Sequence, residues 1–252
     1  MKRSDLFITS QIWPTFHEPE RVEPIVRRQL SDWGLDYFDL YLIHFPVALA
    51  YVDPSVRYPP GWQFDGKLEI RYSGATILDT WKSLEKLVDG GIAKSIGVSN
   101  FQSQILYDLL RGCRIRPATL QVEHHPFLTQ VKLMRLAKKE GIIVTAYSSF
   151  GPSSFREFDS AGHEKARNMV PLLENPVITE IATRAGKQPS QVLLRWSTQS
   201  GHAVIPKTSR KEILPINLDC TGWDLSQEDL DKISALDEGL RFNEPTNVSH
   251  VL

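Results

Sequence analysis

The 252-residue sequence has few features of a secreted, membrane-bound or nucleic-acid-binding protein. It has two cysteines, Cys113 and Cys220, too few for a disulfide framework, so both thiols are expected to stay reduced in the cytoplasm. The net charge of −1 leaves no basic excess for nucleic acid or an anionic membrane surface. The longest apolar runs have only the length of a β-strand, which is too short to span a bilayer. The chain therefore predicts a soluble cytoplasmic protein.

A glycine-rich phosphate-binding motif of the form Gly-x-Gly-x-x-Gly is also missing after every predicted strand, which argues against a Rossmann domain. Instead, strand-like and helix-like segments alternate along the chain. The strand-like segments are residues 6–10 (extended by Ile12 and Trp13), 35–45, 95–100, 119–123, 142–148 and 203–206. Each is followed by a helical pattern, which indicates an α/β fold with a parallel sheet. The length suits a single domain over residues 1–252.

The segment Leu35 to Phe45 is the most apolar of these strands, and Pro46 ends it because proline cannot continue a paired strand. His44 stands at its C-terminal end. Polar residues recur at the same end of the other strands: Gln11, Ser99, Asn100, Gln121, Tyr147, Ser148 and Lys207. In a β/α barrel this end forms the functional face, so the pattern predicts one pocket there.

Proline and aromatic residues concentrate in a loop of about residues 47–74, which contains Tyr51, Tyr58, Trp62 and Phe64. A loop of this length is usually functional, and its aromatic content predicts an ordered flap over a pocket. The tail of residues 239–252 is expected to be irregular. In the helix predicted between Pro19 and Gly34, Pro24 is a candidate for the true start.

The chain resembles the aldo-keto reductases, and most closely their fungal xylose-reductase-like branch. The runs that carry the resemblance follow in family order: Leu6–Ser10, Leu40–Pro46, Ile96–Phe101, Leu120–Pro126, Ala146–Pro152, Val204–Lys207 and Gly239–Pro245. The resemblance implies a (β/α)8 barrel that uses NADPH to reduce aldehydes or ketones. In this family a tyrosine acts as general acid, a lysine lowers its pKa, an aspartate pairs with the lysine, and a histidine orients the carbonyl.

The sequence departs from that catalytic set. The family's aspartate and tyrosine belong to a βα unit upstream of the first strand here, so the resemblance implies an incomplete (β/α)8 TIM-type barrel with about six βα units. Gln11 stands where the family has its lysine, and a neutral amide cannot lower the pKa of a phenol from about 10. His44 alone remains of the four residues. Ordinary carbonyl reduction is therefore expected to be impaired or lost.

The resemblance also implies a set of NADP(H)-binding residues. Ser99, Asn100 and Gln121 would bind the nicotinamide carboxamide, and Tyr147 would stack on its ring. The phosphate and adenine positions would be Ser148, Phe150, Gly151, Ser154, Lys207, Thr208, Ser209 and Asn217. Ile213 occupies the place of a family arginine on the 2′-phosphate, and losing a charge-assisted contact costs on the order of 1.5–3 kcal/mol. NADPH binding is therefore expected to be weakened and less selective against NADH.

The substrate-facing positions implied by the resemblance are Trp13, His44, Phe45, Trp62 and Asn243. No metal is expected at His124 and His125, because adjacent residues of a strand point to opposite faces. His17, His163, His202 and His250 are expected to have no functional role. The missing units would leave two sheet edges, at Leu6–Ile12 and Ala203–Pro206. Such edges predict either a barrel re-closed with fewer strands or, in preference, an oligomer that covers the gap, of which a homodimer is the simplest case.

Several functions fit these observations. The first is a non-redox reaction such as a dehydration, isomerisation or cyclisation. His44, with an ordinary pKa near 6.5, would act as general acid or base, and Gln11 and Asn243 would anchor the small ligand. The second is a residual NAD(P)H-dependent carbonyl reductase. The third is a non-catalytic module that binds a metabolite or nucleotide, and the fourth is a truncated product without function. Hydride transfer from NADPH would separate the second from the others.

Overall fold

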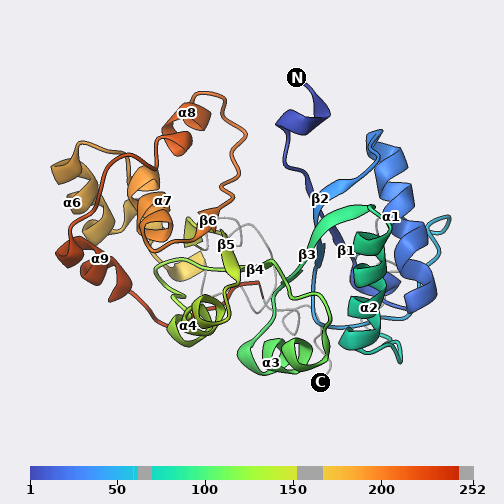
Figure 1. The fold of residues 1–252 in the computed structure, drawn as a ribbon. Coiled ribbons are helices and arrows are strands. Elements are labelled where there is room, and N and C mark those ends of the chain that lie inside the picture. The colour runs from blue at the N-terminus through green and yellow to red at the C-terminus, as the bar shows by residue number, and fades with distance from the viewer. Residues whose placement is uncertain (59, 62–69, 152–166, 244–252) are drawn as a thin grey trace. The chain divides into compact units, whose positions relative to one another are not determined.

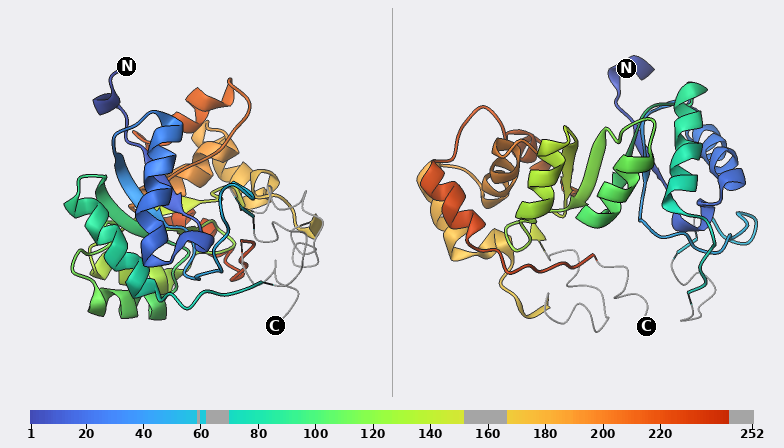
Figure 2. Two further views of the ribbon diagram at one scale, coloured as in Figure 1. Left: turned by 90° about the vertical axis from the view of Figure 1, so that its right-hand side faces the viewer. Right: turned by 60° about the horizontal axis from the view of Figure 1, so that its bottom comes forward.

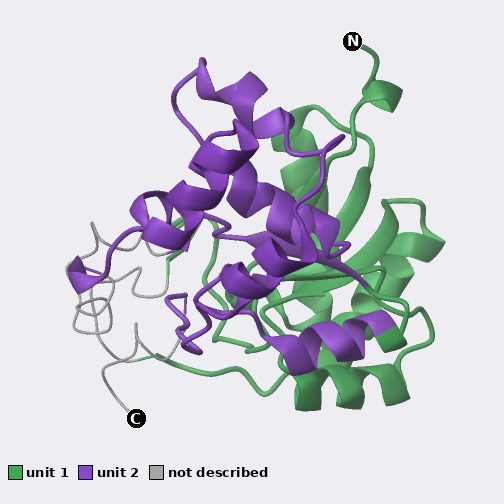
Figure 3. Ribbon diagram, turned by 90° about the vertical axis from the view of Figure 1, so that its left-hand side faces the viewer, with its two compact units in different colours: residues 1–121, 139–142, 249–252 green, residues 122–138, 143–248 purple. Residues whose placement is uncertain are grey.

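The computed structural model describes residues 1–58, 60–61, 70–151 and 167–243 (Figure 1). The chain divides into two compact units, which are described separately below (Figure 3). Unit 1 comprises Met1–Gln121, Lys139–Ile142 and Ser249–Leu252, and unit 2 comprises Val122–Lys138 and Ile143–Val248. Within the described ranges, none of the helices has the length and apolar character needed to cross a membrane. The cytoplasmic location, the single domain and the homodimer stay predictions.

Unit 1 contains a parallel sheet whose strand order follows the chain. The strands are β1 (Thr9–Ile12), β2 (Phe38–Ile43), β3 (Ala93–Ser99) and the first part of β4 (Thr119–Glu123). Leu40 pairs with Thr9 on one side and with Ser95 on the other, and Ser99 pairs with Gln121. All six residues of β2 are buried. The apolar run that ends at His44 is therefore a buried parallel strand with a neighbour on each side, as its composition predicts.

The helices of unit 1 are α1 (Pro19–Trp33), α2 (Ile77–Asp89) and α3 (Ser103–Gly112), and α1 and α2 pack side by side (Figure 1). The buried residues of α1 are its helical stripe Val22, Ile25, Val26 and Leu30. Pro24 lies inside this helix on its exposed side, so the prediction that it marks the start is wrong. Pro19 occupies the first turn instead, and Gly34 ends the helix with a φ of 64°.

The predicted strand over residues 6–10 is shorter and later than expected. A 3-10 helix, η1 (Arg3–Asp5), precedes it, and β1 begins only at Thr9. The Arg3 guanidinium donates to the Asp39 carboxylate at 2.8 Å and to the Tyr37 carbonyl at 2.9 Å. These side-chain bonds hold the N-terminal segment without a strand ladder. A second 3-10 helix, η2 (Pro14–Phe16), follows β1.

Unit 2 contains β5 (Ile143–Tyr147) and β6 (Ala203–Val204), which pair in parallel with Thr145 beside Ala203. After β4, the His124 N–H donates to the Tyr147 carbonyl at 3.1 Å, so these two strand ends meet within unit 2. β6 is only two residues long, although residues 203–206 were predicted. Pro206 has no N–H for a ladder, which fits the early end of this strand.

The helices of unit 2 are α4 (Val131–Lys139, whose last residue belongs to unit 1), η5 (Leu172–Glu174), α6 (Pro176–Ala185), α7 (Pro189–Gln199), α8 (Ile213–Leu218) and α9 (Gln227–Ser234) (Figure 2). Of these, η5, α6, α7 and α9 share one apolar cluster. Leu172, Ile178, Val192, Trp196 and Ile233 are buried together in that cluster. The alternation of parallel strands and helices confirms the predicted α/β class.

Gly97 in β3 is predicted to tolerate no side chain. A Cβ there would lie 2.8 Å from the Thr119 carbonyl oxygen and 2.8 Å from Leu42 Cδ2. Gly97→Ala should therefore lower the free energy of unfolding by about 1–3 kcal/mol, as overpacking of a core does. Urea denaturation measures the change. Gly74→Ala is the matched control, because a Cβ at Gly74 meets nothing within 4 Å. Equal stability of the two variants would contradict the close approach of the strands.

Candidate functional site

The strand ends of unit 1 bring several predicted residues together. Asn100 follows β3 with a φ of 63°, and its Nδ2 donates to the His44 carbonyl at 2.8 Å. The Asn100 N–H donates to the Gln121 carbonyl at 2.9 Å, and the Ser99 hydroxyl donates to the same oxygen at 2.9 Å. These bonds tie the C-terminal ends of β2, β3 and β4 to one another. The predicted role of Ser99, Asn100 and Gln121 toward a carboxamide stays a prediction.

His44 lies among aromatic rings at the end of β2. The Trp13 ring and the imidazole are nearly perpendicular, with their centroids 5.2 Å apart. The Phe45 ring is stacked on the imidazole, with the two centroids 4.7 Å apart. Burial lowers the pKa of His44 to about 4. This value lies well below the unperturbed pKa of histidine, near 6.5. At neutral pH the imidazole is uncharged, so it is suited to hydrogen bonding a carbonyl oxygen rather than to supplying a proton.

Gln11 lies in β1 of the same unit. Its backbone carbonyl accepts from Gln29 Nε2 at 3.4 Å. Its side-chain Oε1 is buried, and within the described ranges it has no hydrogen-bond partner. A buried acceptor without a donor costs free energy, so this atom marks a place where a donor on a ligand would be favoured. The neutral amide supplies hydrogen bonding here but no positive charge.

His17 was assigned no role from the sequence, yet it is a fully buried titratable group whose pKa responds to His44. The side chain is 0% exposed, and neither ring nitrogen makes a well-aligned hydrogen bond to a described residue. Its burial, partly offset by the nearby Ile12 carbonyl, lowers the pKa of His17 to about 4. No sequence pattern marks it, because it follows η2 in a segment without strand or helix periodicity.

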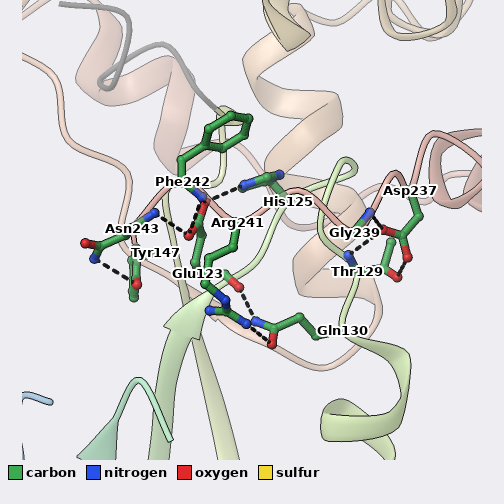
Figure 4. Close-up of polar contacts among 10 residues, drawn as sticks. All are labelled: Glu123, His125, Thr129, Gln130, Tyr147, Asp237, Gly239, Arg241, Phe242 and Asn243. Carbon is green, nitrogen blue, oxygen red and sulfur yellow. Dashed lines mark hydrogen bonds and ion pairs between the residues drawn. The ribbon is translucent and has the colours of Figure 1, made fainter. Parts of the chain in front are cut away.

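The strand end of unit 2 joins Tyr147 to the C-terminal tail (Figure 4). The Asn243 side chain donates through Nδ2 to the Tyr147 hydroxyl at 2.9 Å. Burial, with the nearby Glu123 carboxylate, raises the pKa of Tyr147 well above its ordinary value, so the phenol is neutral under physiological conditions. Two residues with separate predicted roles, ring stacking and substrate contact, are thus in direct contact.

Glu123 is the member of this cluster that sequence reasoning missed. Its side chain is fully buried, and its carboxylate accepts from the backbone N–H groups of Phe242 at 3.0 Å and Asn243 at 2.9 Å. His125 Nε2 lies 2.9 Å from the same carboxylate. His124 is instead stacked on Trp196, with the two ring centroids 4.8 Å apart. Within the described ranges, no group of side chains is arranged to hold a metal ion.

A pocket of about 350 Å³ opens in unit 2 between the loop after β6, the start of α7, and α8. Among the described residues, its lining contains two cations, Lys207 and Arg210, and no acidic residue. Asn217 also lines it, and this amide is 5% exposed with neither Oδ1 nor Nδ2 bonded to a described residue. The described residues that line the pocket are Phe150, Leu173, Gln188, Pro189, Ser190, Lys207, Thr208, Arg210, Ile213, Ile216 and Asn217.

This pocket contains half of the eight predicted phosphate and adenine positions. Phe150, Lys207, Thr208 and Asn217 line it, whereas Ser209 does not. Gly151, beside Phe150, has a φ of 71°, and a Cβ there would lie 2.7 Å from Leu172, so the turn that starts at Ser148 requires glycine at its end. The predicted positions Ser154 and Trp62 lie outside the described residues.

Arg210 is the pocket residue that the sequence did not identify. Ile213 lines the pocket as an apolar wall, as expected from its side chain, and Arg210 provides a guanidinium on the same lining. The signal available was its position three residues after Lys207. An acid-free pocket with two cations and an unpaired amide suits a phosphorylated nucleoside, so these residues fit the adenosine end of a dinucleotide cofactor.

Comparison with known proteins places this geometry in context. The model of the aldo/keto reductase family matches residues 1–238. An NAD(P)H-dependent D-xylose reductase of Pyricularia oryzae is 61% identical over 248 residues, which cover 98% of this chain and 76% of that protein. An NAD(P)H-dependent D-xylose reductase of Hypocrea jecorina is 59% identical over 248 residues, with the same shares covered. The solved structure of the aldose reductase from Schistosoma japonicum is 34% identical, with a TM-score of 0.82 over 99% of this chain and 74% of that chain.

The buried His17 is predicted to make stability depend on pH. Its pKa is about 4 in the folded protein and near 6.5 when unfolded, so the unfolded state takes up the proton first as pH falls. The contribution of neutral His17 is full above about pH 6.5 and is lost progressively toward about pH 4. Between pH 7 and pH 5, this residue should account for a loss of about 2 kcal/mol in the free energy of unfolding.

His17→Gln tests this dependence, because glutamine does not titrate. Urea denaturation should show a shallower fall in stability from pH 7 to pH 5 in the variant than in the wild-type protein. Identical slopes for the two proteins would contradict a neutral, buried His17.

Proposed function

Because the chain belongs to the aldo/keto reductase family, we propose that it binds NADP(H) and reduces the carbonyl group of a small polyhydroxy aldehyde. The observation that carries this proposal is the acid-free pocket of unit 2 with its two cations and its unpaired buried amide. The D-xylose reductases of two fungi, each matched over nearly the whole chain, support the nicotinamide cofactor and the aldehyde class.

The pocket residues divide the recognition of the adenosine end among them. Lys207 and Arg210 would make charge-assisted hydrogen bonds to the 2′-phosphate, and the Arg210 fork allows two parallel bonds. The Asn217 amide offers one donor group and one acceptor, which match the donor and acceptor edge of adenine. Arg210 thus supplies a positive charge despite Ile213, so we propose that selectivity for NADPH is retained.

The strand ends would handle the substrate. When bound, the reduced cofactor would supply a hydride to the carbonyl carbon, and the alkoxide oxygen that results would take up a proton from water. Neutral His44 would donate a hydrogen bond to the carbonyl oxygen and orient it, and the Trp13 and Phe45 rings beside the imidazole would form an apolar wall. The Gln11 amide, which lies in the same unit as His44, would bind a hydroxyl group of the substrate.

A second candidate function is ligand binding with a non-redox reaction or with no turnover. It is favoured by one observation, the neutral Gln11 at the position where the family resemblance implies a lysine. Without a cation there, a phenol is a poorer proton donor at neutral pH. The two candidates differ in whether NADPH is oxidised by an aldehyde, and both require the ligand to bind.

Nucleotide binding is predicted to depend on the pocket cations. Lys207→Ala and Arg210→Ala should each weaken NADPH binding by roughly 10- to 100-fold and NADH binding by less than about threefold, because only NADPH carries the 2′-phosphate. Quenching of tryptophan fluorescence or calorimetry measures both affinities. Lys211→Ala is the control, since Lys211 does not line the pocket. Absence of binding to either nucleotide at millimolar concentration would refute the proposed function.

Turnover is predicted to depend on the hydrogen bond from His44. His44→Leu should lower kcat/KM for NADPH-dependent reduction of D-xylose or glyceraldehyde by about 10²–10³-fold, while NADPH affinity stays within about twofold. His44→Gln retains a donor and should recover part of the loss. Oxidation of NADPH followed by absorbance is the measurement. If the wild-type protein binds NADPH but no aldehyde oxidises it, the second candidate function is the correct one.

A further inference from the structure

The tail of unit 2, residues 237–243, is hydrogen-bonded along its length to the segment after β4 (Figure 4). The Asp237 carboxylate accepts from the Thr129 hydroxyl and from the Gly239 N–H at 3.0 Å. The Leu240 N–H donates to the Phe127 carbonyl at 2.9 Å. Arg241 Nη2 donates to Gln130 Oε1 at 2.7 Å. Apart from the Gly239 bond, which is local, these contacts join residues more than a hundred positions apart in the sequence.

Glu123 also holds this tail through hydrogen bonds, and its side chain is fully buried. Both of its carboxylate oxygens accept from the Phe242 N–H, at 3.0 and 3.1 Å, and one of them also accepts from the Asn243 N–H at 2.9 Å. A buried carboxylate is tolerated only where hydrogen bonds replace its lost water. With the imidazole of His125 at 2.9 Å as a further partner, both oxygens of Glu123 are occupied as acceptors.

Glu123 influences Tyr147 through one intermediate residue, Asn243. Glu123 holds the backbone of Asn243, and the Asn243 side chain donates to the Tyr147 hydroxyl at 2.9 Å. The orientation of the phenol ring is therefore linked to the buried carboxylate. A glutamine at position 123 could not do the same, because its NH₂ group cannot accept hydrogen bonds from backbone N–H groups.

We propose that Glu123 is a positioning residue for the ring of Tyr147 and for the Asn243 amide, and that it acts by fixing the backbone of residues 242 and 243. This inference deepens the proposed function, because Tyr147 and Asn243 are the residues expected to contact the nicotinamide ring and the substrate. Glu123 itself touches neither ligand. It sets the geometry of two groups that do.

Amide hydrogen exchange tests the anchor without any ligand. In Glu123→Gln, exchange of the Phe242 and Asn243 amides should accelerate roughly 10- to 100-fold, while the Gly239 and Leu240 amides change by less than about threefold. Glu85→Gln is the matched control. Glu85 is also a buried carboxylate that accepts two backbone N–H groups, from Arg114 at 2.6 Å and Ile115 at 2.8 Å, but it lies in unit 1. It should leave the exchange of residues 242 and 243 unchanged.

Fluorine NMR of protein labelled with fluorotyrosine tests the effect on Tyr147. The resonance missing in Tyr147→Phe identifies this ring. Glu123→Gln and Asn243→Leu should each move that resonance in the same direction, and Glu85→Gln should leave it in place. Asn243→Leu keeps the test decisive if Glu123→Gln does not fold, because it removes the contact and leaves the anchor intact. An unmoved Tyr147 resonance in the folded variants, or unchanged exchange of residues 242 and 243 in Glu123→Gln, would overturn the proposal.

Kinetics separate this inference from the proposed function. If the protein reduces aldehydes, Glu123→Gln and Asn243→Leu should each raise KM about tenfold, and the double variant should resemble the single ones because both changes act on one contact. Loss of reduction in the wild-type protein would refute the proposed function alone, since exchange and fluorine NMR still report the anchor. Fully additive effects in the double variant would refute positioning through Asn243.

Discussion

The buried carboxylate of Glu123 is the constraint on which the ligand-facing part of unit 2 depends. Removing a charge from water is costly, and here backbone N–H groups of Phe242 and Asn243, with the His125 imidazole, replace the lost hydration. The same bonds fix the tail against β4. Asn243 in turn donates a hydrogen bond to Tyr147. The bonds that stabilise the buried Glu123 carboxylate therefore also determine the geometry of the candidate site.

Charge is distributed in a way that matches two different tasks. The strand ends of unit 1 present neutral polar groups, since burial keeps the imidazole of His44 uncharged and Gln11 has no charge to lose. The pocket of unit 2 presents two cations and no acid. Neutral donors suit the orientation of a carbonyl, whereas cations suit a phosphate. Each unit therefore has the electrostatics that its proposed ligand group requires.

Short sequence patterns correctly predicted the features that depend on residues close together in the chain. The apolar run of β2, the helical stripe of α1 and the left-handed Gly34 follow from residues close in sequence. The importance of Glu123 could not be found in this way, because its partners at residues 242 and 243 lie more than a hundred positions away. Burial of His17 and the lowered pKa of His44 likewise depend on packing. The place of Arg210 in the pocket depends on how the loop after β6 folds, and no local sequence pattern indicates it.

The central claim is that the cations of unit 2 meet the 2′-phosphate of a dinucleotide. Phosphorus NMR of bound NADP⁺ across a pH titration tests it most directly. A phosphate monoester has its second pKa near 6, and Lys207 and Arg210 beside it should lower that pKa by about one unit or more. The same lowering should disappear in Arg210→Ala. A 2′-phosphate that titrates in the complex as it does in free NADP⁺ would contradict the account.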